Sequence, residues 1–312
     1  MDNKNNIQGD KQGSWAVDRE HLRKLCALDI EKKLDDSRDS FVAEELLESL
    51  SCVQLDNIDI DIDHSECTTA TTYFQPSRTI DEALKHLLSP DWFELSPGEA
   101  MRLYPEYKAA WFTGPWDEAS SGKRGEVEID RFGGSAWRCI EDRCDVRDTT
   151  GLVLPMGDFR TVHEYNSDFA FFPNDEKKPH LACIISDTIV SPHTILRSEI
   201  HGAFFLITYQ MVIKRFSDHR IKPVMLYTFQ GDVCARITQA YYDPDMGKIV
   251  IRQSRMLDLR GPKPTEDAWL LMRWMLNTPV GDTLIKSEDG GLSVRAKEPD
   301  AGPQKPTAAA TA

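Results

Sequence analysis

The pattern of apolar residues is clearest in the last third of the chain. From Ser198 to Phe216 apolar residues occur on almost every face of a helix, which is typical of a helix buried on most sides. Three β-type runs follow at Pro223–Phe229, Val233–Tyr242 and Ile249–Leu257, and the turns between them are short enough to make neighbouring strands antiparallel. A last helix, Thr265–Asn277, starts at a threonine cap and carries two tryptophans. The pattern predicts a buried helix, a three-stranded meander and a Trp-bearing helix packed as one unit.

The chain before this unit has a different, acidic character. Residues 16–112 contain short amphipathic stripes with capping signals, which predicts a helical N-terminal region. A Gly/Pro/Ser-rich loop at 113–123 precedes short β-type runs, so we expect a core domain over 125–290. Residues 1–15 and 296–312 have the composition of disordered segments. The expected fold class is α+β: a helical acidic N-terminal region, then a mixed or antiparallel sheet packed on the buried helix and on the C-terminal Trp-bearing helix.

Composition and charge restrict the classes of partner. The 312 residues carry a net charge of −14; residues 1–75 hold 17 acidic and 8 basic residues, whereas residues 195–260 hold 6 and 10. A net negative charge disfavours nucleic acid and anionic membrane surfaces. No apolar run is long enough for a membrane span, and the first 15 residues do not read as a secretory signal. The 7 scattered cysteines are then expected to be reduced thiols. The sequence predicts an intracellular protein, cytoplasmic or nuclear, whose partner is another protein; its oligomeric state is left open.

Three carboxylates at the start of the expected core domain form a candidate catalytic group. Glu126, Glu128 and Asp130 are spaced by two, so a strand would present them on one face. Such a group could hold a divalent metal or act in acid/base catalysis, although a solvated strand face explains it too. A metal-dependent hydrolase or nuclease-like enzyme is therefore one hypothesis.

A second acidic stretch, residues 54–72, shows the same alternation. Asp59, Asp61 and Asp63 would share one strand face and could bind a hard cation, but an edge strand or extended arm whose acids prevent aggregation is the favoured interpretation. The cysteine and histidine spacings do not match a structural zinc site. Neither of the Gly-rich phosphate-binding motifs is present, so the sequence identifies no metal site and no cofactor.

Further candidate residues lie in the C-terminal unit. Ser198 and His201 stand near the start of the buried helix, where a hydroxyl and an imidazole could act in nucleophilic catalysis, although the chain has no Gly-x-Ser-x-Gly turn. A core histidine is the favoured interpretation of His201, and Glu199 is interpreted as a charge suited to a helix N-terminus. Arg236 and Arg252 could share one face of the meander and contact an anion or an acidic partner.

Two stretches of the C-terminal third carry a resemblance. They are His219 to Asp258, HRIKPVMLYTFQGDVCARITQAYYDPDMGKIVIRQSRMLD, and Arg273 to Thr283, RWMLNTPVGDT. The order of helix, Pro-led strand, Gly turn, strand ending in an aromatic pair and Asp, strand, and Arg-Trp helix resembles a set of uncharacterised proteins of filamentous fungi. The resemblance implies an intracellular fungal protein and carries over no activity, cofactor or catalytic residue.

Two hypotheses of different class follow. The favoured one is a non-enzymatic interaction or ancillary protein whose acidic N-terminal region docks on the core or on a partner. It is based on the reversal of charge along the chain and on the lack of a specific catalytic motif. The alternative is the metal-dependent enzyme that would use the strand carboxylates.

Overall fold

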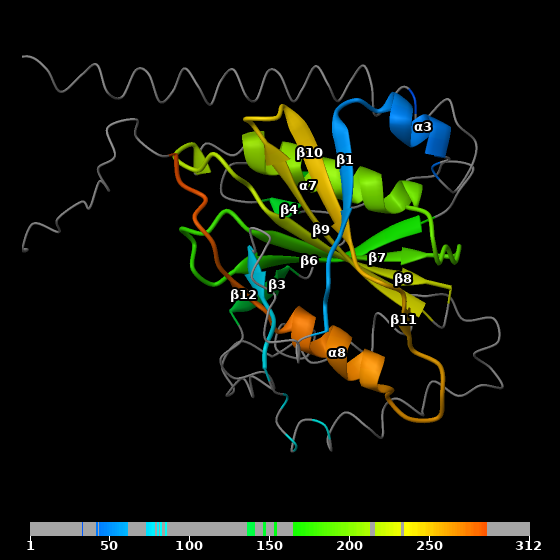
Figure 1. Ribbon diagram of the computed structural model, residues 1–312. Coiled ribbons are helices and arrows are strands. Elements are labelled where there is room, and N and C mark those ends of the chain that lie inside the picture. Colours follow the sequence, from blue (N-terminus) through cyan, green and yellow to red (C-terminus); the bar gives the residue numbers. More distant parts are fainter. Residues whose placement is uncertain are drawn as a thin grey trace, which may run out of the picture.

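The computed structural model describes residues 33, 42, 44–61, 73–78, 80, 82, 85, 136–140, 146–147, 153–154, 165–212, 216–231 and 234–285. Within these residues the chain forms a mixed sheet with a helix on each face (Figure 1). The strand order is β1-β10-β9-β8-β7-β6-β3, and β11 pairs with β9 as well. An α+β fold is therefore confirmed.

The element bounds are as follows. The sheet consists of β1 (Val53–Asn57), β3 (Trp137–Ile140), β6 (Tyr165–Pro173), β7 (Leu181–Asp187), β8 (Val224–Gln230), β9 (Cys234–Asp243), β10 (Lys248–Gln253) and β11 (Leu257–Asp258). Two small pairs are formed by β2 (Phe74–Gln75) with β12 (Thr278–Pro279) and by β4 (Val146–Arg147) with β5 (Val153–Leu154). The helices are α3 (Glu44–Ser49), α7 (Arg197–Val212) and α8 (Glu266–Met275).

The connection through α7 decides where the polar residues meet. β7 and β8 are parallel neighbours, so the chain has to cross over between them, and α7 makes that crossing on one face of the sheet. The carboxyl ends of β7 and β8 therefore lie at the same edge, next to the start of α7. The strands β8, β9 and β10 then form the antiparallel meander that the turns predicted.

The α7 face holds one of the two hydrophobic clusters. Side chains of α7 pack against β7, β8, β9 and β10, as the apolar character of the helix predicted. The helix lies very close to β7 at Gly202, where an added Cβ would be 2.6 Å from the Ile185 Cδ1 atom. Glycine at this position therefore permits the close approach of helix and sheet.

The α8 face holds the other cluster. The Thr265 hydroxyl accepts a hydrogen bond from the Ala268 amide at 3.1 Å, which is the N-cap that the sequence predicted. Beyond the helix end, the Asn277 side chain donates to the Trp274 carbonyl at 2.7 Å. The Trp274 indole donates to the Ile60 carbonyl at 3.0 Å, and this bond ties α8 to the segment that follows β1.

The N-terminal region, which was expected to be mainly helical, contributes an edge strand to the main sheet. β1 lies parallel to β10 at the edge of the main sheet, so residues 53–57 belong to the same sheet as the C-terminal unit. The expected strand 249–257 is divided into β10 and β11, because the Ser254 hydroxyl and amide both bond to the backbone of Ile237 between them. Residues 1–15, the loop 113–123 and residues 296–312 lie outside the described residues.

Among the helices that the structure describes, none combines the length and the apolar character needed to cross a membrane.

Candidate functional site

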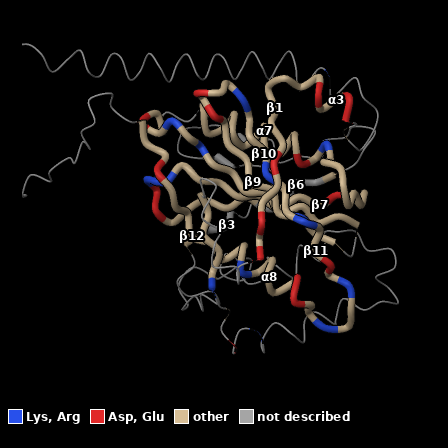
Figure 2. The backbone as a smooth tube through the Cα atoms, in the orientation of Figure 1, with Lys and Arg blue, Asp and Glu red and all other residues tan. Residues whose placement is uncertain are grey.

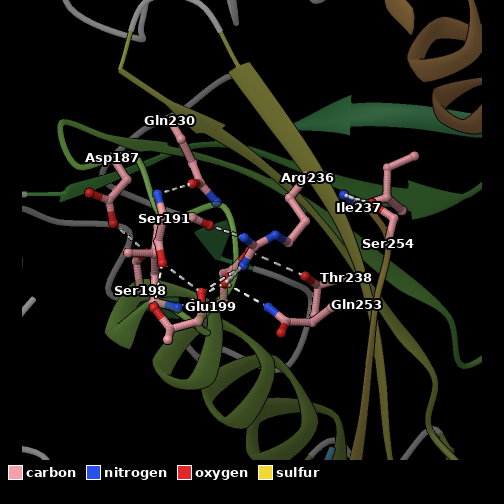
Figure 3. A network of polar contacts seen from close by, with 12 residues as sticks. Asp187, Ser191, Ser198, Glu199, Gln230, Arg236, Ile237, Thr238, Gln253 and Ser254 are labelled. Carbon is pink, nitrogen blue, oxygen red and sulfur yellow. Dashed lines mark hydrogen bonds and ion pairs between the residues drawn. The ribbon is translucent and has the colours of Figure 1, made fainter. Parts of the chain in front are cut away.

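A network of buried polar side chains lies where β7 and β8 end and α7 begins (Figure 3). In sheets with parallel strands, ligand sites commonly occupy the crevice at the carboxyl ends of those strands. Asp187 and Gln230 are the last residues of β7 and β8 and face each other in register. Glu199 comes from the first turn of α7, and Arg236 comes from β9.

Glu199 is the acceptor at the centre of this network. Its carboxylate accepts hydrogen bonds from the Leu196 backbone amide at 2.9 Å, the Gln253 side-chain amide at 2.8 Å and the Arg236 guanidinium at 3.1 Å. The bond to Leu196 caps the start of α7 in the manner of a capping box. Burial raises the pKa of Glu199, and the adjacent Arg236 guanidinium opposes that rise.

Arg236 connects Glu199 to the loop between β7 and α7. Its guanidinium donates to the backbone carbonyls of Ser191 and Thr194 as well as to Glu199. The loop is fixed at a further point, because the Gln230 side-chain oxygen accepts from the Ser191 amide at 2.9 Å. The guanidinium therefore holds loop 188–196 against the helix and the sheet.

Asp187 and Ser198 form a second contact of the network. The Ser198 hydroxyl donates to Asp187 at 2.5 Å, and the other carboxylate oxygen of Asp187 accepts the Ile189 amide at 2.9 Å. Both side chains are fully buried. The polar groups of the network bond mainly to one another and to the loop, so the arrangement acts as an internal clamp between α7, β9 and the loop.

A second polar site lies on the α8 side of the sheet and is open. It is a cleft of about 330 Å³ lined by the start and outer face of α8, by residues of the segment 78–85, by Asp61 and by Arg255. We call it the α8 cleft. Acidic and basic residues lie close together at this end of the molecule, around the segment that leads into α8 (Figure 2). Among the described residues, the lining contains four acidic and four basic side chains.

Part of this charge is neutralised within the cleft. Arg255 forms ion pairs with Asp61 at 3.1 Å and with Asp267 at 2.7 Å, so one guanidinium satisfies two carboxylates. These bonds raise the pKa of Arg255 and join the segment after β1 to the first turn of α8. Lys85 pairs with Glu82 at 2.9 Å.

Two guanidinium groups of the cleft have no carboxylate partner among the described residues. Arg78 is exposed, and Arg273 is half-buried on α8. The Arg273 Nε atom donates to the Ser77 carbonyl at 3.0 Å, and the Ser77 amide donates back to the Arg273 carbonyl at 3.0 Å. Arg78 follows Ser77 directly, so this docking brings both guanidiniums to the same cleft. The half-buried indole of Trp269 completes the wall, with the Lys85 ammonium 6.0 Å from its ring centroid.

Of the candidate catalytic residues, the structure describes Ser198 and His201 but not the three strand carboxylates. Glu126, Glu128 and Asp130 lie outside the described residues, so their role as a catalytic group stays a prediction. His201 is half-buried on α7, and its Nδ1 atom lies 2.8 Å from the Tyr165 hydroxyl. Ser198, three residues earlier, is bonded to Asp187 instead of to His201. The described contacts therefore do not assemble a serine–histidine pair.

The expectation that Arg236 and Arg252 share one face is wrong. Tyr242 pairs with Ile249 and Thr238 pairs with Gln253, so even-numbered residues of β9 lie opposite odd-numbered residues of β10. Arg236 points to α7 and bonds to Glu199, whereas Arg252 lies on the α8 side, 5.4 Å from the Tyr241 ring centroid. The two side chains cannot contact one anion together.

The acidic stretch 54–72 is only partly described. β1 ends at Asn57, and beyond it the Asp59 carboxylate accepts the Asp61 amide at 3.0 Å, so these residues do not continue one strand face. Asp61 pairs with Arg255, and Asp63 lies outside the described residues. β1 itself is an edge strand of the main sheet, but it ends before Asp59 and Asp61, so these acidic residues do not lie on the edge strand that was expected to carry them.

The sequence interpretation placed Glu199 at the helix N-terminus, where it lies, but missed its ion pair with Arg236, and it missed the whole of the α8 cleft. A signal for Glu199 was present, since it is an acidic residue in an apolar helix and Arg236 is a basic residue in an otherwise uncharged part of a strand. No comparable signal marked the cleft, because Arg78 and Arg273 are far apart in the sequence.

Comparison with known proteins adds no identification: no protein-family model matches the chain, and searches of curated proteins and of solved structures find no match either.

Proposed function

We propose that this chain is a non-enzymatic interaction protein that binds an acidic segment of another protein in the α8 cleft. The observation that carries the proposal is the presence of two guanidinium groups, Arg78 and Arg273, in an open cleft without carboxylate partners among the described residues. Recognition of acidic segments by clustered arginines is a recurring mode of peptide binding. An intracellular setting is part of the proposal, and the burial of Cys52 and Cys183 among apolar residues is in line with it.

The contrast between the two polar sites supports the choice of the cleft. In the clamp around Glu199 the charges are buried and bonded to each other, so they are already used in holding α7, β9 and the loop together. In the α8 cleft, Arg255 pairs with two carboxylates. Arg78 and Arg273 line the same open cleft and have no carboxylate partner among the described residues. Arginine side chains are favoured for binding carboxylates because their planar N–H groups match the two carboxylate oxygens.

A direct test measures the binding of a short fluorescein-labelled peptide that has two glutamates and a tyrosine in a Ser/Gly context. We expect saturable binding by fluorescence anisotropy, weakening with added salt because the contacts are ionic. Replacing Arg78 by Gln should weaken binding at least about tenfold, which corresponds to about 1.4 kcal/mol. Arg78 suits this test because it is exposed and makes no described contact that the fold needs.

Two controls isolate the cleft. Arg260→Gln removes another exposed arginine, one outside the lining, and should leave binding unchanged. A peptide with glutamines in place of the glutamates should not bind. The proposal fails if the acidic peptide shows no saturable binding, or if Arg78→Gln and Arg260→Gln bind it equally well.

A further inference from the structure

We propose that the preferred occupant of the α8 cleft is a phosphomonoester on an aromatic side chain, that is, a phosphotyrosine of the partner segment. This inference depends on the proposed function, and it specifies the chemistry of the group that the cleft recognises. It is carried by the number of unpaired guanidiniums, by their geometry, by the acidic residues around them and by the indole beside them.

The first argument is the fixed orientation of Arg273. Its Nε atom is held by the Ser77 carbonyl at 3.0 Å, and the Ser77 amide is held by the Arg273 carbonyl. With Nε engaged, the two terminal nitrogens of the planar guanidinium are left for a ligand in the cleft. A guanidinium held in this way loses less conformational entropy on binding than a free side chain does.

The second argument is the negative charge that a ligand needs in order to pair with both guanidiniums. One carboxylate is satisfied by a single arginine through two parallel hydrogen bonds. A phosphomonoester carries about −1.5 to −2 charges at neutral pH and has three strong acceptor oxygens, so it can engage Arg78 and Arg273 together. A single glutamate would leave one of them unpaired.

The third argument excludes a longer polyanion. Glu266 is exposed at the cleft and would repel additional carboxylates of an acidic run, whereas Glu82 is already paired with Lys85 and offers them no binding partner. The whole chain carries a net charge of −14, which disfavours the approach of extended polyanions. A compact dianion gains the contacts with both arginines while it exposes the least charge to these residues.

The fourth argument concerns the carrier of the phosphate. Trp269 is half-buried and presents an indole to the cleft beside the arginines. Aromatic rings favour stacked or edge-to-face contacts with one another, so an aryl phosphate gains a contact that phosphoserine lacks. The volume of about 330 Å³ is at the small end for ligand pockets, which suits one side chain.

The test compares peptides that share the Ser/Gly context and differ in the central group: phosphotyrosine, phosphoserine, two glutamates with tyrosine, or tyrosine alone. We expect phosphotyrosine to bind about tenfold tighter than the glutamate peptide and several-fold tighter than phosphoserine. Trp269→Leu should remove the preference over phosphoserine. Arg273→Lys retains a charge but not the planar N–H pair, so it should weaken phosphotyrosine binding more than glutamate binding. Because the second pKa of a phosphomonoester is about 6, phosphotyrosine binding should also weaken as the pH falls from about 7 to 5.

Each outcome separates this inference from the proposed function. Equal affinity for the phosphotyrosine and glutamate peptides overturns the inference and leaves the proposed function standing. Equal affinity for the phosphotyrosine and phosphoserine peptides overturns the inference that the phosphate is carried by an aromatic side chain. Phenyl phosphate is the probe for a free small molecule; if it binds as tightly as the phosphotyrosine peptide, the assignment to a protein segment is overturned. If no anionic peptide binds, both the inference and the proposed function fail.

Discussion

Glu199 on α7 and Arg236 on β9 form an ion pair at 3.1 Å in which both side chains are at most 2% exposed. Their partners include the N-terminal amide of the helix, a side chain of β10 and two carbonyls of loop 188–196. A single pair thus joins the loop 188–196 and the start of α7 to the strands β9 and β10.

Removing only one partner of this ion pair should strongly destabilise the fold. Arg236→Met leaves the Glu199 carboxylate buried without its cation, and removing one partner of a buried pair costs about 3–5 kcal/mol. We expect this loss in the free energy of unfolding measured by urea denaturation. The exposed pair of Arg260 with Asp258 offers a matched control, since an exposed ion pair adds little to stability and Arg260→Gln should leave the free energy of unfolding almost unchanged.

The free energy of unfolding of a typical domain is about 5–15 kcal/mol, so the loss expected for Arg236→Met is large enough to prevent this variant from folding. The double variant Glu199→Leu with Arg236→Met covers that case, because replacing both charges with apolar groups should restore part of the loss. If Arg236→Met is as stable as Arg260→Gln, the clamp does not hold the structure.

His180 should make the fold sensitive to acid. Burial lowers the pKa of His180 to about 4, and its Nε2 atom lies 3.0 Å from the Val280 carbonyl, to which the neutral ring donates. An unfolded histidine has a pKa of about 6.5, so the unfolded chain takes up the proton first as the pH falls. The contribution of neutral His180 is present above about pH 6.5 and is lost progressively as the pH falls toward 4.

The slope of this loss approaches about 1.4 kcal/mol per pH unit for one histidine. His180→Gln retains a donor for Val280 and should flatten the pH dependence of unfolding between about pH 6.5 and 4. The exposed His193→Gln serves as the control for removal of an imidazole. Identical pH slopes for the parent and His180→Gln would contradict the account. Burial lowers the pKa of His219 as well, and it contributes in the same direction.

Gly202→Ala should test how closely α7 approaches the sheet. The added methyl group would lie 2.6 Å from the Ile185 Cδ1 atom, and overpacking of this kind costs about 1–3 kcal/mol. Alanine also has the better helix propensity, by about 1 kcal/mol. We therefore expect a net loss of about 1 kcal/mol on its own.

In an Ile185→Val background the atom that meets the new methyl group is absent. Gly202→Ala should then be neutral or stabilising, and a double-mutant cycle from urea unfolding should show favourable coupling. Additive effects of the two substitutions would show that the helix does not contact the strand at this point.

The features that could be predicted from the sequence are those that local patterns specify. The apolar character of α7, the turns between β8, β9 and β10, and the Thr265 cap each follow from a few consecutive residues. The parallel pairing of β1 with β10 could not be predicted in this way, because it joins segments nearly 200 positions apart.

The error over Arg236 and Arg252 has the same origin. Both residues were identified as strand cations, but the register across the turn at 244–247 decides which residues lie opposite each other, and a shift by one residue moves a side chain to the other face. The α8 cleft depends even more on tertiary structure, since Ser77 has to dock on Arg273 before Arg78 reaches the cleft.

The most direct test of the binding role of the cleft is an NMR titration that follows the tryptophan indole N–H signals, with the Trp269 signal assigned from Trp269→Phe. Addition of the glutamate peptide, and of the phosphotyrosine peptide, should shift the Trp269 signal in a saturable manner. The signal of buried Trp274, whose indole is bonded to the Ile60 carbonyl, should stay in place. A Trp269 signal that does not move when the peptides are in large excess would contradict the assignment of the α8 cleft as the binding site.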